Sequence, residues 1–190
     1  MGKPSFRFSS AGRIFESGGS TLFSIEEDIY FLLGVLNSKL GELAVGILSP
    51  KVSLGEGAVA KFPIPKFDDE IKKSISKIAY TLVEDFKNME FFNESSFHFK
   101  GLDLLNSSEI FISDYSIRFQ NFFNMKIEDI YEKERTIDDL ISKQPLQNEK
   151  NNSNDRDVNE FSDEVVGQKI LSYAIGCMMG RYSLDEPGLI

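Results

Sequence analysis

The 190-residue sequence contains one cysteine, one histidine and no tryptophan. A single cysteine, Cys177, excludes an internal disulfide and a cysteine-based zinc site, and it is typical of a reducing cytoplasm. Because Cys177 lies in an apolar stretch beside two methionines, we expect a buried, unreactive thiol. The one histidine, His98, excludes a histidine-rich metal site. Between Phe97 and Phe99, it is expected to pack or to cap rather than to catalyse.

Long apolar runs and phosphate-binding loops are also missing. The first ten residues, MGKPSFRFSS, contain no apolar signal-peptide core, and no apolar stretch approaches the roughly 18 residues that cross a bilayer. Neither G-x-x-x-x-G-K-[ST] nor a helix-opening G-x-G-x-x-G occurs, so GEG at 55–57 is interpreted as a structural turn or bulge. These absences predict a cytoplasmic chain with no membrane span.

Acidic side chains outnumber basic ones in the second part of the chain. The net charge is −9, which alone argues against non-specific binding to nucleic acid. Residues 1–66 carry seven basic and six acidic side chains, a net charge of +1, so residues 67–190 carry −10. The two parts differ electrostatically, which indicates different roles.

Residues 1–66 are predicted to form a small module of strands and one helix. Apolar and polar residues alternate over 5–15, as is typical of short strands joined by a turn, and 21–25 is interpreted as another strand. A short strand at 58–65 would leave the module through two prolines.

Apolar residues recur at helical spacing first near 29–40, after Ser24 and Glu27, which form a candidate capping box. Asp68 or Asp69 could cap the next helix. Its apolar stripe comprises Ile71, Ile75, Ile78, Ala79, Leu82, Val83 and Phe86. A later helix is expected over 109–143, with Phe119, Phe122, Phe123, Ile127, Ile130 and Tyr131 as candidate core.

The predicted fold class is therefore α+β, a small mixed α/β module followed by a mainly helical segment. Residues 1–66 are assigned to the module and 67–143 to the helical segment, with a loop at 93–101. Residues 144–160 are almost free of apolar side chains, so a disordered linker is predicted there. Residues 161–190 are expected to hold an apolar helix, over 165–180, and the C-terminal tail.

No set of residues predicts catalysis. The acidic clusters at 68–70 and 138–139 are interpreted as solvated helix ends, and the phenylalanine-rich stretch at 91–123 as core rather than a base-stacking platform. Arg181 and Tyr182 could end a helix or contact a ligand.

Two stretches of the N-terminal part resemble a known kind of region. FRFSSAGRIFESGGSTLFSIEEDIYFLLGVLNSKL, followed by ILSPKVSLGEGAVAKFPIP, is similar to target-recognition regions. Such regions occur in adenine-specific DNA methyltransferases and in specificity subunits of restriction–modification systems. In that pattern Leu-Asn-Ser ends a helix and a proline-bearing exit leads to a long helix. The corresponding structural residues here are Asn37, Ser38, Pro63 and Pro65.

Two further stretches narrow the resemblance. NMEFFNESSFHFKGLDLL at 88–105 and ILSYAIGCMMGRYSLDEPGLI at 170–190 resemble segments of PglX, the methyltransferase of BREX phage-defence systems. The order of the stretches is that of the family. The sequence differs from the family in two places. Within 88–99 it has Phe where the family has Trp, and the polar run QPLQNEKNNSNDRDVNE precedes its last stretch.

The resemblance implies a role in adenine-N6 methylation of DNA, in which a catalytic domain flips out the target base. The full-length family uses S-adenosyl-L-methionine. The glycine-bearing cofactor loop and the [NDS]-P-P-[YFW] motif are absent here, so no catalytic residue, metal or cofactor is assigned to this chain. The sequence is interpreted as an internal fragment or separately encoded remnant of a PglX-like protein, holding its target-recognition region.

Double-stranded DNA is the partner implied. The DNA-facing candidates, chosen by charge and location rather than by motif, are Lys3, Arg7, Arg13, Lys51 and Lys61. Asn37 and Ser38 are expected to cap a helix end rather than to read bases. Two alternatives stay open: a protein-interaction module for other BREX subunits or an upstream methyltransferase half, and an inactive gene remnant.

Overall fold

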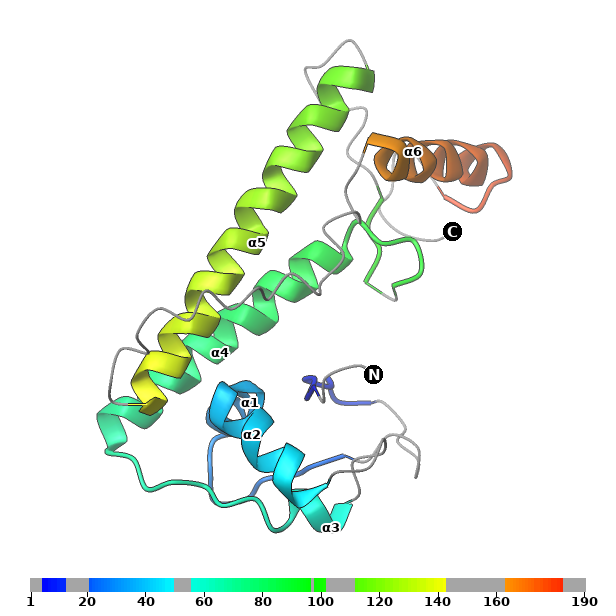
Figure 1. The fold of residues 1–190 in the computed structure, drawn as a ribbon. Helices are drawn as coiled ribbons and strands as arrows, with labels where there is room; N and C mark the ends of the chain where they lie inside the picture. Colours follow the sequence, from blue (N-terminus) through cyan, green and yellow to red (C-terminus); the bar gives the residue numbers. More distant parts are fainter. Residues whose placement is uncertain are drawn as a thin grey trace. The chain divides into compact units, whose positions relative to one another are not determined.

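The computed structural model describes residues 5–12, 21–49, 56–96, 98–101, 112–142 and 163–182. The helices are α1 (Ile29–Asn37), α2 (Lys39–Leu48), α3 (Glu56–Val59), α4 (Asp69–Glu90), α5 (Ile112–Ser142) and α6 (Asp163–Met178) (Figure 1). The chain divides into two compact units. Unit 1 comprises Met1–Val83 and Tyr131–Asn148, and unit 2 comprises Glu84–Ile130 and Glu149–Ile190.

The predicted α+β class is wrong, because the described residues contain helices and no β-strand. Residues 5–10 and 21–24 have no regular structure, as do 62–68. A strand needs a neighbour for its backbone hydrogen bonds. Both backbone groups of Phe6 instead bond to the side-chain amide of Asn37, with Phe6 N to Asn37 Oδ1 at 2.9 Å and Asn37 Nδ2 to Phe6 O at 3.0 Å.

Two local predictions within unit 1 also need correction. The expected turn or bulge around Gly57 is instead the single helical turn α3. Ser24 does bond to Glu27, with Glu27 N to Ser24 Oγ at 3.1 Å, but this bond closes a turn before the helix. The N-cap of α1 is Asp28, whose Oδ1 accepts from Tyr30 N at 2.7 Å and Phe31 N at 3.3 Å. An N-cap carboxylate satisfies amides that have no partner within the helix.

The core of unit 1 joins α1, α4 and the end of α5. Its buried members are Phe31, Leu32, Val35, Ile75, Ala79 and Ile137. Close packing explains Gly34 on α1, since a Cβ there would lie 2.7 Å from Ile75 Cγ2. Burying a side chain the size of Phe31 stabilises by about 1.5–3 kcal/mol. The α5 residues confirm that unit 1 is built from two separated stretches of chain.

The core of unit 2 is aromatic. Its buried members are Phe99, Tyr115, Phe119, Phe123, Val166, Ile170, Tyr173 and Tyr182. The interpretation of the phenylalanine-rich stretch as core is confirmed for Phe99, Phe119 and Phe123. Cys177 is only half-buried, packed against this cluster.

Two residues predicted to be core in this part of the chain are exposed, Phe86 by 42% and Phe122 by 40%. On α4 the inward position is taken instead by Asp85, whose buried carboxylate accepts from Lys126 Nζ at 3.0 Å. A buried carboxylate needs such a partner.

The long helices follow the predicted pattern. α4 begins directly after Asp68, α5 covers 112–142 of the expected 109–143, and α6 covers 163–178. The expected linker at 144–160 lies outside the described residues. No single described helix is long and apolar enough to cross a membrane; α1 and α2 pass that test only as a pair bent by 75°.

Candidate functional site

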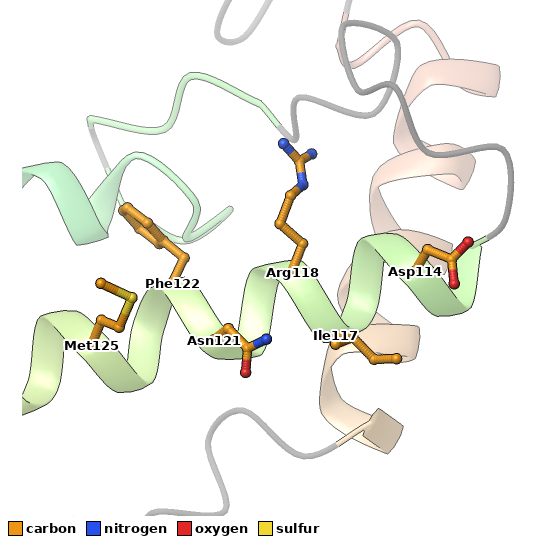
Figure 2. A pocket seen from close by; sticks show the side chains of 6 residues that line it. All are labelled: Asp114, Ile117, Arg118, Asn121, Phe122 and Met125. Carbon is orange, nitrogen blue, oxygen red and sulfur yellow. The ribbon is translucent and has the colours of Figure 1, made fainter.

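The described residues hold no group of three or more His, Cys, Asp or Glu side chains that could bind a metal ion. A hollow of about 520 Å³ lies on α5, lined by Asp114, Ile117, Arg118, Asn121, Phe122 and Met125. All six side chains come from this one helix and project in different directions, without converging on a common point (Figure 2). Arg118 lies over the ring of Tyr115, with its Cζ 5.3 Å from the centroid. This open surface offers no set of groups for chemistry.

The predicted DNA-facing residues divide into two groups. Lys3, Arg13 and Lys51 lie outside the described residues. Arg7 and Lys61 are exposed, the first in the segment before α1 and the second just after α3. The structure gives no contact that brings these two together.

Arg7 is held in place by its neighbours on both sides. Phe6 is bound through its backbone to Asn37, whose Nδ2 also donates to Leu33 O at 3.0 Å. Phe8 stacks on Tyr30 of α1, with ring centroids 5.3 Å apart and an interplanar angle of 15°. Residue 7 is therefore fixed against α1 while its side chain faces solvent.

Ser38 forms the junction between α1 and α2. Its Oγ donates to Val35 O at 2.6 Å at the end of α1 and accepts from Gly41 N at 3.2 Å as the N-cap of α2. Gly41 is required here, because a Cβ would overlap the carbonyl of Leu36. The prolines act elsewhere: Pro63 and Pro65 lie in the irregular segment that leads into α4.

Asp138 of α5 caps the same helix from outside. Its Oδ1 accepts from Lys39 N at 2.9 Å, at the first residue of α2. Burial raises the pKa of Asp138 above its usual value of 3.8, and the hydrogen bond from Lys39 opposes that shift. The interpretation of residue 138 as a solvated helix end is therefore wrong, because its carboxylate is half-buried and bonded to another helix.

An aromatic ladder links the N-terminal segment to α4. We use this name for Phe8, Tyr30 and Tyr80, in which the ring of Tyr30 stacks on Phe8 and meets Tyr80 edge-on at 5.2 Å. Tyr80 is 48% exposed. Residues separated by about 70 positions in the sequence are thereby joined through one continuous row of rings.

No family model matches the chain. It is 27% identical over an alignment of 214 positions to the adenine-specific methyltransferase BrxX of Escherichia coli O9:H4 (strain HS), and the alignment covers 98% of this chain. It is 26% identical over 196 positions to the adenine-specific methyltransferase PglX of Lacticaseibacillus casei (strain Zhang), covering 97% of this chain. The resemblance to PglX-type adenine-specific methyltransferases is confirmed. The chain spans only 17% and 16% of the lengths of these two relatives.

The two stretches that carry the PglX-like pattern, 88–105 and 170–190, pack together in the described part of unit 2. Phe99 lies 6.0 Å from Tyr173 and 5.1 Å from Tyr182 between ring centroids. Glu94 accepts from Ser172 Oγ at 2.8 Å and from Tyr182 Oη at 3.2 Å. The described PglX-like residues therefore pack with one another in the core of unit 2.

Two exposed lysines on α4, Lys73 and Lys77, were missed because the DNA-facing candidates were taken only from residues 1–66. The signal was present in IKKSISK at 71–77, since no acidic residue follows Glu70 until Glu84. Lys72, by contrast, faces inward, where its Nζ lies 2.7 Å from Glu27 Oε1.

Proposed function

We propose that the chain is a DNA target-recognition and scaffold portion of a PglX-type, site-specific adenine-N6 DNA methyltransferase, acting in the cytoplasm. The observation that carries this proposal is the similarity of nearly the whole chain to two adenine-specific methyltransferases. Unit 1 would meet double-stranded DNA, and the described part of unit 2 would support it.

Choice of the methylated adenine is the step assigned to this chain. Phosphate contacts would fix the register of the protein on the duplex, and side chains in the major groove would distinguish base pairs. The bond between Asn37 and Phe6 supports this role, because it holds an irregular segment in a fixed position on α1. Ser38 in turn fixes the junction between α1 and α2.

Methyl transfer itself is not assigned to this chain. The residues present do not fit S-adenosyl-L-methionine, since the sequence lacks both the cofactor loop and the Pro-Pro motif. The hollow on α5 also lacks converging polar groups. The cofactor and the flipped adenine would bind to another part of a PglX-type enzyme.

Two measurements on the full chain test this proposal. Fluorescence anisotropy with a pool of random-sequence duplexes, from 50 to 200 mM salt, should show binding that weakens with salt. Neutralising three to five phosphates predicts a log–log slope of roughly −3 to −4. Sequencing of the bound duplexes should reveal a preferred site.

In a tritiated-methyl assay the chain alone should transfer nothing, with the Escherichia coli relative as positive control. Absence of binding at 50 mM salt, or transfer by the chain alone, would overturn the proposal.

One observation favours a second function, that of a protein-interaction module. The outer face of α6 exposes Leu171 by 62%, Ile175 by 46%, Met178 by 87% and Met179 by 78%. An apolar surface of this kind is typical of contacts between proteins. A chain that binds no duplex but associates with another subunit of a BREX system would favour this function.

A further inference from the structure

The outward face of α4 in unit 1 carries positive charge that no ion pair among the described residues neutralises. Lys73 and Lys77 are exposed, and within the described residues neither forms an ion pair. The other lysines of α4 differ from these two. Lys72 is bound to Glu27, and Lys87 lies 2.8 Å from Glu84 Oε1.

The aromatic ladder connects the segment that carries a third exposed cation, Arg7, to α4. Tyr80 lies one helical turn after Lys77, and residues three apart are neighbours on a helix surface. Through Tyr30 the ladder connects Tyr80 to Phe8, and Arg7 precedes Phe8 in the chain. The backbone bonds of Phe6 to Asn37 prevent this segment from leaving α1. Phe8 is thus two ring contacts away from Tyr80 of α4, and Arg7 is its neighbour in the chain.

The spacing of these cations suits a nucleic-acid backbone. Lys73 and Lys77 are separated by about 6 Å along the helix axis, at 1.5 Å per residue. Successive phosphates of one DNA strand advance by about 3.4 Å along the duplex axis. Lysine side chains are long and flexible enough to reach neighbouring phosphates from such positions. Tyrosine hydroxyls, such as that of Tyr80, also donate to phosphate oxygens.

Carboxylates bound this face at both ends. Asp69 and Glu70 lie in the first turn of α4, where the helix N-terminus favours negative charge. Toward the other end, Glu84 is occupied by Lys87. The positive surface is therefore short, with room for two or three phosphates.

We propose that Lys73 and Lys77 on the face of α4, together with Arg7, bind the phosphate backbone of duplex DNA. This inference rests on the proposed function and deepens it by naming the surface of unit 1 that positions the duplex. Contacts to phosphates carry no sequence information, so this surface sets register and affinity, and base reading belongs to other residues.

The test compares variants of the full chain that have equal net charge. K73Q/K77Q removes two cations from the proposed surface. K87Q/K169Q removes two cations from unit 2, leaves the partner of the buried Asp85 in place, and is the matched control. Binding to a random-sequence duplex pool is measured by anisotropy between 50 and 200 mM salt. Circular dichroism melting confirms that each variant is folded.

Each lost phosphate contact should reduce the magnitude of the log–log salt slope by about 0.9. We expect K73Q/K77Q to lower this magnitude by about 1.8, R7Q to lower it by about 0.9, and K87Q/K169Q to leave it unchanged. K73R/K77R should retain wild-type binding, because the charge is kept. The loss should be equal for all sequences in the pool.

The outcomes separate the two proposals. If wild-type chain binds DNA and K73Q/K77Q has the same slope as wild type, the phosphate surface is wrong and the proposed function stands. An equal loss in K87Q/K169Q would show that only the net charge matters, and it would also overturn the proposed surface. Wild-type chain that binds no duplex at 50 mM salt would overturn both.

Discussion

Unit 1 and unit 2 are stabilised internally by different kinds of contact. In unit 1, polar side chains bind backbone groups of other segments: Asn37 binds Phe6, Ser38 joins two helices, and Asp138 binds Lys39 N. In unit 2, aromatic rings pack on one another, and Glu94 receives the hydroxyls of Ser172 and Tyr182. Unit 1 fixes irregular segments in position, whereas unit 2 concentrates ring packing.

The two units also differ in what they expose. The face of α4 in unit 1 presents Lys73 and Lys77, which suits an anionic ligand. The face of α6 in unit 2 presents Leu171, Ile175 and Met178, which suits an apolar one. This difference supports our proposal that unit 1 binds DNA.

The largest expected effects come from emptying each core. Replacing Phe31 of unit 1 or Phe123 of unit 2 by Ala should lower the free energy of unfolding by about 3–5 kcal/mol, because both side chains are buried. Hydrogen exchange followed by peptide should show the loss of protection mainly in the unit that carries the change. Phe23, which is 72% exposed, is the control, and its replacement by Ala should cost less than about 0.5 kcal/mol. Equal loss of protection in both units from either core variant would contradict the division into two units.

A smaller effect is expected from Asn37→Ala. The change removes hydrogen bonds to both backbone groups of Phe6 and should cost about 1–2 kcal/mol, since these bonds are on the surface. Amide exchange of residues 5–10 should accelerate while unit 2 is unaffected. If Arg7 binds phosphate from a fixed position, DNA affinity should also fall. Asn93→Ala, which removes a local turn bond in unit 2, is the control. Unchanged exchange of Phe6 in Asn37→Ala would contradict the role assigned to this amide.

The sequence predicted the long helices well because their signal is local. The stripe that includes Ile75, Ala79 and Val83 repeats at helical spacing, and these residues are buried in α4. The strand predictions failed because alternation does not specify a partner. Phe6 and Phe8 alternate with polar residues, yet neither pairs with another strand. The backbone of Phe6 bonds to the side-chain amide of Asn37, and the ring of Phe8 stacks on Tyr30. That choice depends on α1, which lies some 20 to 30 residues away in the sequence.

The candidate site was predictable only in part, for the same reason. Arg7 could be named from its charge, but its position depends on Tyr30 and Tyr80, which no local pattern connects to it. Asp138 was assigned to a solvated helix end because it forms an acidic cluster with Asp139. Its actual partner, Lys39 N, is 99 residues away. Interactions between side chains and backbone over such separations leave no periodic trace in a sequence.

The smallest expected effect distinguishes the charge of Asp138 from its hydrogen bond. Burial raises the pKa of this carboxyl above 3.8 in the folded state, so folding favours its protonated form. The free energy of unfolding should therefore fall as the pH rises through the folded pKa, and the stabilising contribution of Asp138 is fully present only below pH 3.8.

Asp138→Asn keeps an oxygen that can accept from Lys39 N and removes the charge, so it should flatten this pH dependence without loss of stability at neutral pH. Asp138→Ala should flatten it as well but cost about 0.5–2 kcal/mol, because the amide at the start of α2 loses its cap. Denaturant unfolding from pH 4 to 7 gives both quantities, and Asp139→Asn, at an exposed carboxylate, is the control. A wild-type stability that rises over this range through Asp138, with Asp138→Asn abolishing the rise, would mean that the bond from Lys39 outweighs burial.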